Sequence, residues 1–94
     1  MNKTQLQQLQ ALARRIRREI ALCVMLLEAD SNCAAGEETM RGRLTQALES
    51  HRRRVRALLL LARRRLASKE HWLSWLRTQC LIDENFANRY LKTA

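Results

Sequence analysis

The sequence has 94 residues and a formal net charge of +9, from 18 Lys and Arg side chains against 9 Asp and Glu. Hydrophobic residues make up 47% of it, yet its longest apolar runs are far shorter than the ~20 residues of a membrane-spanning helix, and its first residues lack the apolar core of a signal peptide. With no proline and only 2 glycines, the chain favours long helices, so we expect an all-α fold in a single domain over residues 1–94 and no membrane partner.

The first predicted helix covers about residues 4–29, with Thr4 as its N-cap. Its apolar residues alternate spacings of three and four, the pattern of a helix that packs lengthwise on another helix. The segment 30–36 combines Asp, Ser, Asn and Gly, which are typical of loops and helix C-caps. The apolar stripe consists of Leu6, Leu9, Ala13, Ile16, Ile20, Cys23 and Leu27.

A second predicted helix covers about residues 38–67 and carries a similar stripe. Two long helices joined by a short loop form an antiparallel hairpin, here residues 4–67. Further apolar residues lie outside both stripes, so two hairpins could also associate as a homodimeric four-helix bundle. The second stripe consists of Met40, Leu44, Ala47, His51, Val55, Leu58, Ala62 and Leu66. The residues outside the stripes are Leu12, Leu22, Met25, Leu26, Leu59 and Leu61.

Residues 68–94 are predicted to form two short helices. The first starts at Ser68 and ends near residue 80, a turn follows at residues 81–82, and Asp83 caps a last helix that ends near residue 93. This is the helix-turn-helix outline, whose second helix reads base edges in the major groove. The exposed positions of that helix would be Asn85, Asn88, Arg89 and Lys92. The alternative is a helical cap that closes the hairpin core with Trp72, Trp75, Phe86 and Tyr90.

Three clusters on the predicted hairpin hold eleven arginines. Residues 37–69 contain ten basic and three acidic side chains, a charge of +7, whereas residues 70–94 contain three of each. If the loop centres near residue 34, the first two clusters lie at one level, where their repulsion favours an acidic partner. The alternative is that they are solvated helix faces whose Arg stems cover the core edge. The clusters are Arg14, Arg15, Arg17 and Arg18; Arg52, Arg53, Arg54 and Arg56; and Arg63, Arg64 and Arg65.

The remaining side chains do not predict catalysis. The sequence contains no Ser/His/Asp arrangement, Gly-rich phosphate loop or zinc-like Cys/His spacing, so we expect a non-enzymatic protein without a cofactor. Cys23, Cys33 and Cys80 are an odd and scattered set, which favours reduced thiols in a cytoplasmic protein. His51 lies on an apolar stripe, which indicates a core or interface residue, with a pH switch as the alternative.

The last third of the chain carries a longer sequence pattern. The run 66–76 reads LASKEHWLSWL, and Asp83, Ala87, the tripeptide 89–91 (RYL) and Ala94 follow it. This resembles an uncharacterised phage and mobile-element family in which a Lys-Glu helix end leads to an aromatic-x-x-Trp-Leu helix and then to a Ser-capped helix with an Ala-x-Arg-Tyr-Met core. Here Leu81 stands where that pattern has a turn glycine, and Asp83 replaces the Ser cap. The resemblance implies a phage or plasmid origin more than a reaction or a ligand, and its short helix-turn-helix-like segment brings DNA contact into consideration.

These observations lead to two main hypotheses about function. The first is a non-enzymatic phage- or plasmid-type protein that binds DNA or regulates its use. The second is an inhibitor or adaptor that docks an Arg-rich helical face on an acidic or DNA-accepting surface of a host protein complex. A structural bundle subunit is a third class. The candidate residues for binding a nucleic acid or an acidic partner are Arg14, Arg15, Arg18, Arg52, Arg53, Arg56, Arg63, Arg64, Asn85, Asn88, Arg89 and Lys92.

Overall fold

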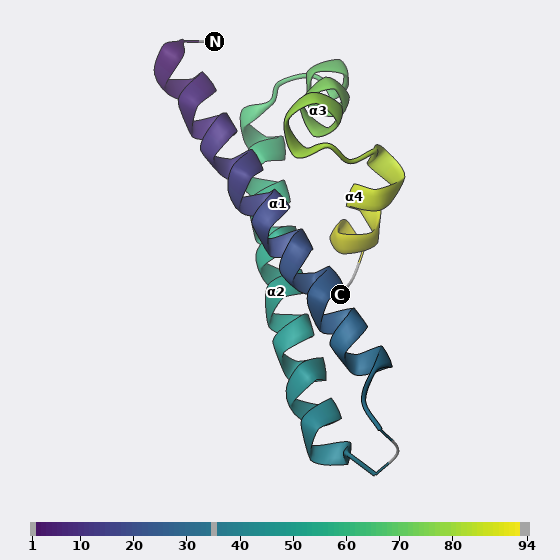
Figure 1. Cartoon of the computed structure of the whole chain (residues 1–94). Helices are drawn as coiled ribbons and strands as arrows, with labels where there is room; N and C mark the ends of the chain where they lie inside the picture. The colour runs from purple at the N-terminus through teal and green to yellow at the C-terminus, as the bar shows by residue number, and fades with distance from the viewer. Residues whose placement is uncertain (1, 35, 93–94) are drawn as a thin grey trace.

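The computed structural model describes residues 2–34 and 36–92, and these residues form an all-α fold (Figure 1). Two long helices form an antiparallel hairpin, and two short helices follow it, as the sequence predicts. A π-helical segment, η1, directly continues the first short helix. The elements are α1 (Lys3–Ser31), α2 (Glu38–Arg65), α3 (Lys69–Trp75), η1 (Leu76–Cys80) and α4 (Glu84–Leu91).

Side-chain caps fix three of the helix starts. The prediction of Thr4 as the first N-cap is wrong, because α1 begins one residue earlier and Asn2 caps it. The Asn2 side chain accepts a hydrogen bond from the backbone N–H of Gln5 (2.8 Å), and the Gln5 side chain accepts one from Asn2 N–H (3.1 Å), which is a capping box. Ser68 and Asp83 cap α3 and α4, as predicted. The predicted end of the last helix near residue 93 lies outside the described residues, and α4 ends at residue 91.

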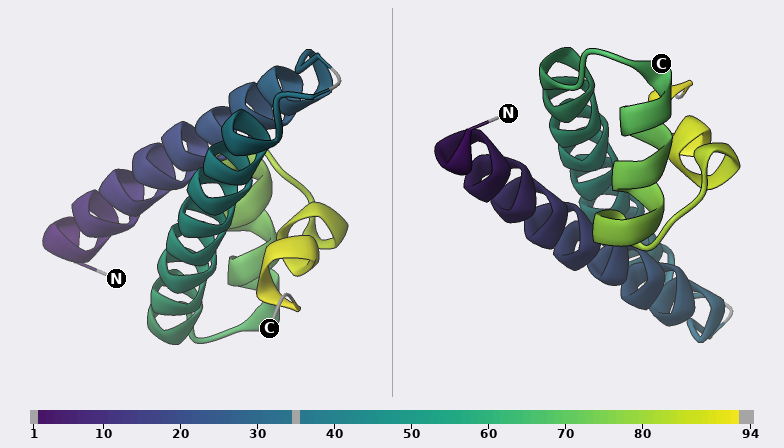
Figure 2. Two further views of the ribbon diagram at one scale, coloured as in Figure 1. Left: turned by 90° about the horizontal axis from the view of Figure 1, so that it is seen from below. Right: turned by 90° about the horizontal axis from the view of Figure 1, so that it is seen from above.

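The hairpin opens away from its loop, and the C-terminal elements fill the opening. Both views of Figure 2 show α1 and α2 meeting near the loop and diverging toward the N-terminus of α1. In this gap η1 packs on α1, while α4 packs on α2. Trp72 and Trp75 are buried there, with their rings stacked 5.9 Å apart. The predicted helical cap is therefore present for Trp72, Trp75 and Tyr90, whereas Phe86 is half-buried and contacts the Tyr90 ring.

The core joins residues from all five elements. It uses part of the apolar surface that the sequence leaves outside the two stripes, because Leu12 and Leu59 are buried in it, while Leu22 and Leu26 are half-buried. The expectation that this whole set is free to bury a second hairpin is thus wrong for Leu12 and Leu59. The buried core residues are Leu9, Leu12, Ala13, Ile16, Val55, Leu58, Leu59, Ala62, Leu66, Trp72, Trp75, Leu76, Cys80 and Ala87.

The loop end of the hairpin extends beyond the C-terminal elements (Figure 1). The radius of gyration is 15.3 Å, whereas a compact domain of this length has about 12 Å. Leu27 and Met40 belong to the predicted stripes but are 44% and 49% exposed, because no third layer covers them. Leu6, at the other end of α1, is 50% exposed because the two helices have diverged there. The predicted stripes therefore hold in the middle of the hairpin and at Leu66, and fail at Leu6, Leu27 and Met40.

The turn between η1 and α4 has an unusual backbone conformation. Leu81 has φ 60° and ψ 35°, in the left-handed region. The carbonyl of Leu76 accepts hydrogen bonds from the backbone N–H groups of Leu81 and Ile82. An L-residue in this region costs about 1–2 kcal/mol, which is why glycine is the usual residue at such a position. The predicted turn at residues 81–82 is confirmed, and it is strained.

Candidate nucleic-acid interface

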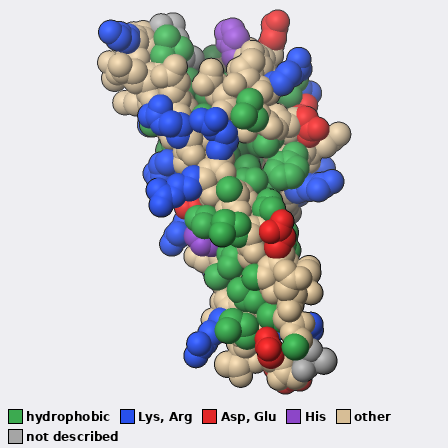
Figure 3. Space-filling view, in the orientation of Figure 1, with side chains coloured by type: hydrophobic (Ala, Val, Ile, Leu, Met, Phe, Trp, Pro, Cys, Tyr) green, Lys and Arg blue, Asp and Glu red, His purple; other side chains and the backbone are tan. Residues whose placement is uncertain are grey.

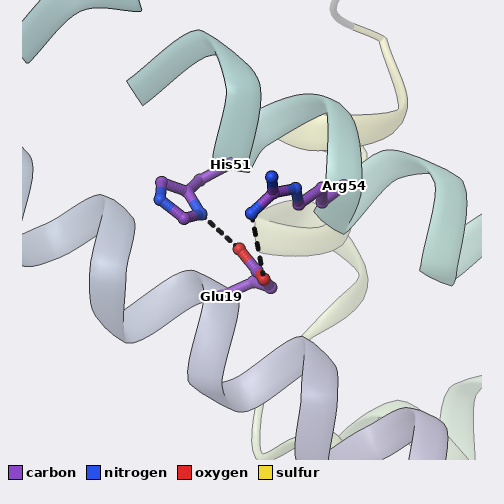
Figure 4. A network of polar contacts seen from close by, with 3 residues as sticks. All are labelled: Glu19, His51 and Arg54. Atoms are coloured by element: carbon purple, nitrogen blue, oxygen red, sulfur yellow. Dashed lines mark hydrogen bonds and ion pairs between the residues drawn. The ribbon is translucent and has the colours of Figure 1, made fainter. Parts of the chain in front are cut away.

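A carboxylate of α1 fixes the level at which the first two arginine clusters meet. Glu19 accepts a hydrogen bond from His51 Nδ1 of α2, and its other oxygen lies 3.9 Å from a guanidinium nitrogen of Arg54 (Figure 4). The clusters at residues 14–18 and 52–56 are therefore at one level, as the sequence predicts. The position of His51 as an interhelical interface residue is confirmed as well. Glu19 and Glu49 are the two carboxylates that the sequence places near the arginine clusters, and the structure shows that Glu19 joins the two helices.

On the side of the hairpin away from α3 and α4, these residues line a hollow of about 280 Å³. Three guanidinium groups and one imidazole surround the single carboxylate of Glu19, whose side chain is 14% exposed. In Figure 3, basic side chains gather along the upper left edge of the molecule, on the opposite side from α3 and α4. The excess of forked donors suits a carboxylate or a phosphate. We call this set the α1–α2 surface: Arg15, Arg18, Glu19, Leu22, His51 and Arg54.

On the opposite side of α2, the C-terminal elements hold the arginines. Arg56 Nε donates a hydrogen bond to the carbonyl oxygen of Leu91 in α4 (3.4 Å). The guanidinium of Arg63 lies 5.8 Å from the centre of the Trp72 ring, a cation–π contact. Arg52 is half-buried, and its charge acts on Tyr90 of α4. Arg56 and Arg63 are therefore held by direct contacts with the C-terminal elements.

The helix α4 presents three of its four predicted DNA-contacting residues on one stripe. Asn85, Arg89 and Lys92 are exposed, and their spacing of four and three places them on one helix face. Asn88 differs, because it is half-buried and lines a hollow of about 290 Å³ together with Arg63 and Glu84. We call the combined set the α2–α4 surface: Arg52, Arg56, Arg63, Asn85, Asn88, Arg89 and Lys92.

The remaining basic residues of the three clusters have separate positions. Arg14, Arg53 and Arg64 are exposed on the outer faces of α1 and α2. Arg17 lies on the side of η1, where its charge acts on Cys80. Arg65 donates a hydrogen bond to the side-chain oxygen of Gln8 (2.8 Å) and so ties the open ends of α1 and α2 together. The structure thus divides the predicted arginine clusters between two sides of the hairpin.

The cysteines are not positioned as nucleophiles. Burial raises the pKa of the Cys80 thiol to about 12, and the charge of Arg17 opposes this shift only in part. Burial also raises the pKa of Cys23, against a hydrogen bond with Tyr90. Because a thiol reacts as its thiolate, both are packing residues, as predicted. Cys33 is half-buried in the loop.

Comparison with known proteins gives no relative: no family model, curated protein or solved structure matches the chain. Within residues 2–34 and 36–92, no group of three or more His, Cys, Asp and Glu residues is placed to hold a metal ion. Across the same part of the chain, no helix has the length and apolar character needed to cross a membrane.

Proposed function

We propose that this protein is a non-enzymatic DNA-binding protein that contacts duplex DNA through the α2–α4 surface. The observation that carries the proposal is the exposed stripe of Asn85, Arg89 and Lys92, with Arg56 and Arg63 held beside it by contacts to the same helix pair. Side chains that are already ordered lose less conformational entropy on binding. The sequence resemblance supports a regulatory role in a phage or plasmid.

The charges of the surface define how DNA would approach. Asp83 and Glu84 lie at the start of α4, so phosphates are attracted to its second half and to the neighbouring arginines of α2. Arginine and lysine contacts to phosphates set the position of the protein, and Asn85 is the residue placed to read a base edge. The surface holds five cations, Arg52, Arg56, Arg63, Arg89 and Lys92.

The test is the binding of a labelled duplex, measured by fluorescence anisotropy at several salt concentrations. If all five cations contact phosphates, the slope of log K against log salt is about −4.5. The double variant Arg89→Ala/Lys92→Ala should make this slope smaller by about 2 and weaken binding at least ~10-fold. The matched variant Arg15→Ala/Arg54→Ala removes the same charge from the other side and should keep a slope much closer to that of the parent protein. No duplex binding at low salt would overturn the proposal.

A second candidate function is docking on an acidic protein, and the α1–α2 surface favours it. There, three arginines and a histidine share one carboxylate around a hollow, so an incoming carboxylate would meet unneutralised donors. In this case the protein has no duplex affinity of its own, and the Arg15→Ala/Arg54→Ala variant loses the partner while Arg89→Ala/Lys92→Ala retains it. A pull-down from host lysate with the two variants separates the two functions.

A further inference from the structure

We propose that two copies of this chain associate through the outer face of α1, antiparallel and with two-fold symmetry. This inference does not depend on DNA binding. The face is a stripe of exposed residues with alternating spacings of four and three, the pattern of a helix that packs lengthwise on another helix. We call it the outer α1 stripe, and it consists of Arg14, Arg18, Ala21, Met25, Glu28 and Asn32.

The centre of the stripe is apolar and uncovered. Met25 is 63% exposed, and Val24 beside it is 46% exposed. Figure 3 shows hydrophobic side chains along the loop half of the hairpin, below the level at which the C-terminal helices end. A two-helix hairpin buries only the faces that its helices turn toward each other. A further helix against α1 would cover this half of the molecule.

The charges of the stripe identify that further helix as a second copy of α1 in the opposite direction. The stripe is basic at its N-terminal end and acidic at its C-terminal end, so it complements itself only when antiparallel. Arg18 of one copy then faces the partner's Glu28, and Ala21 faces the partner's Met25. The small Ala21 side chain leaves room for the methionine, and each contact occurs twice, as two-fold symmetry requires.

The same arrangement also fits the charge of the whole hairpin. Residues 21–50 hold five acidic and two basic side chains, whereas residues 1–20 hold one acidic and five basic. An antiparallel pair places the acidic loop half of one copy beside the basic half of the other, and a parallel pair would superpose like charges. None of the residues of the α2–α4 surface belongs to the stripe, so both copies keep that surface open.

The length of the stripe sets the expected affinity. Eighteen residue steps of α-helix span about 27 Å, and a single helix stripe lies at the small end of specific interfaces. The dimer is therefore expected to be weak, with a dissociation constant on the order of micromolar. Sedimentation velocity over a concentration series up to ~200 µM, in ~0.15 M salt, covers this range and screens the net charge.

Charge reversal across the stripe tests the proposal. Arg18→Glu and Glu28→Arg should each weaken dimerisation at least ~10-fold, because each places like charges opposite each other twice. The double variant Arg18→Glu/Glu28→Arg restores both pairs with reversed sign and should restore the dimer. Arg43→Glu and Glu49→Arg, which change exposed residues of α2 outside the stripe, are the matched controls and should dimerise like the parent. Circular dichroism confirms that each variant is folded.

Three results would overturn the proposal. The first is a parent protein that sediments as a monomer over the whole concentration range. The second is a dimer that the single reversals leave unchanged, which would place the interface elsewhere. The third is a double variant that stays monomeric while both single variants and the controls are folded.

Discussion

The two sides of α2 carry the same residue type in different environments. Arg52 and Arg54 are two positions apart, yet Arg52 lies beside Tyr90 of α4 and Arg54 lies beside Glu19 of α1. On the α2–α4 side, arginines contact a backbone carbonyl and an indole ring. On the α1–α2 side, Arg54 pairs with the carboxylate of Glu19, and Arg15 and Arg18 line the same hollow. Arginines that are neighbours in the sequence therefore do not form one surface. The packing of the helix pair on one side of α2 separates them into two groups.

This difference assigns different properties to the two sides. The α2–α4 surface depends on the docking of η1 and α4, so its geometry is lost when those elements detach. The α1–α2 surface depends on the hairpin alone and on the charge balance at Glu19. Substitutions that act on one side only can therefore separate the two surfaces.

The docking of η1 is tested by Leu76→Ala. Leu76 is fully buried between the hairpin and the C-terminal helices, and truncation of such a leucine lowers the free energy of unfolding by about 2–5 kcal/mol. Urea unfolding followed by circular dichroism measures the change. Leu81→Ala, at a leucine that is 68% exposed, is the control and should change stability by less than about 0.5 kcal/mol. Equal effects of both variants would contradict the packing of η1.

The burial of the Cys80 and Cys23 thiols is tested by measuring stability at alkaline pH. Burial raises the pKa of Cys80 from 9.0 to about 12, so between these values the unfolded chain has lost a proton that the folded chain retains. Stability therefore falls as pH rises through this window. Burial raises the pKa of Cys23 and Tyr90 in the same direction. Cys80→Ala should make the fall in unfolding free energy less steep, whereas Cys33→Ala, in the loop, should leave it unchanged.

The charge balance of the α1–α2 surface is tested by Glu19→Ala. The change removes the carboxylate that accepts the hydrogen bond from His51 and leaves three neighbouring arginines without a counter-charge. We expect a loss of about 1 kcal/mol, because the pair is partly exposed and its interaction is screened. Glu49→Ala, at an exposed carboxylate on α2, should change stability by only a few tenths of a kcal/mol. A neutral Glu19→Ala would show that Glu19 does not hold the two helices together.

The strained turn is tested by Leu81→Gly. Glycine adopts the left-handed conformation of this position without a steric penalty, which stabilises the folded state. Its greater backbone freedom also stabilises the unfolded chain, which offsets part of this gain. The net effect should be an increase in unfolding free energy of about 0.5–1 kcal/mol. A loss of stability would instead show that the Leu81 side chain contributes packing that outweighs the strain.

The sequence predicts the hairpin, the helix pair and two of their caps, since stripes and capping residues are local patterns. It misses Asn2 as the first cap, although Asn2 and Gln5 have the N-cap and N3 spacing of a capping box. It also predicts the level at which the clusters meet, because loop position fixes the register of a hairpin. It does not predict how the arginines divide between two sides, because that depends on which face η1 and α4 cover.

The most direct test of the central claim is an NMR titration of the protein with a short duplex, with backbone amides and arginine side chains resolved. We expect the largest shifts in α4 from residue 85 onward, at its C-cap Lys92, and at Arg56 and Arg63 of α2, with small changes at Arg15 and Arg54. Shifts confined to the α1–α2 surface, or none at low salt, would contradict it.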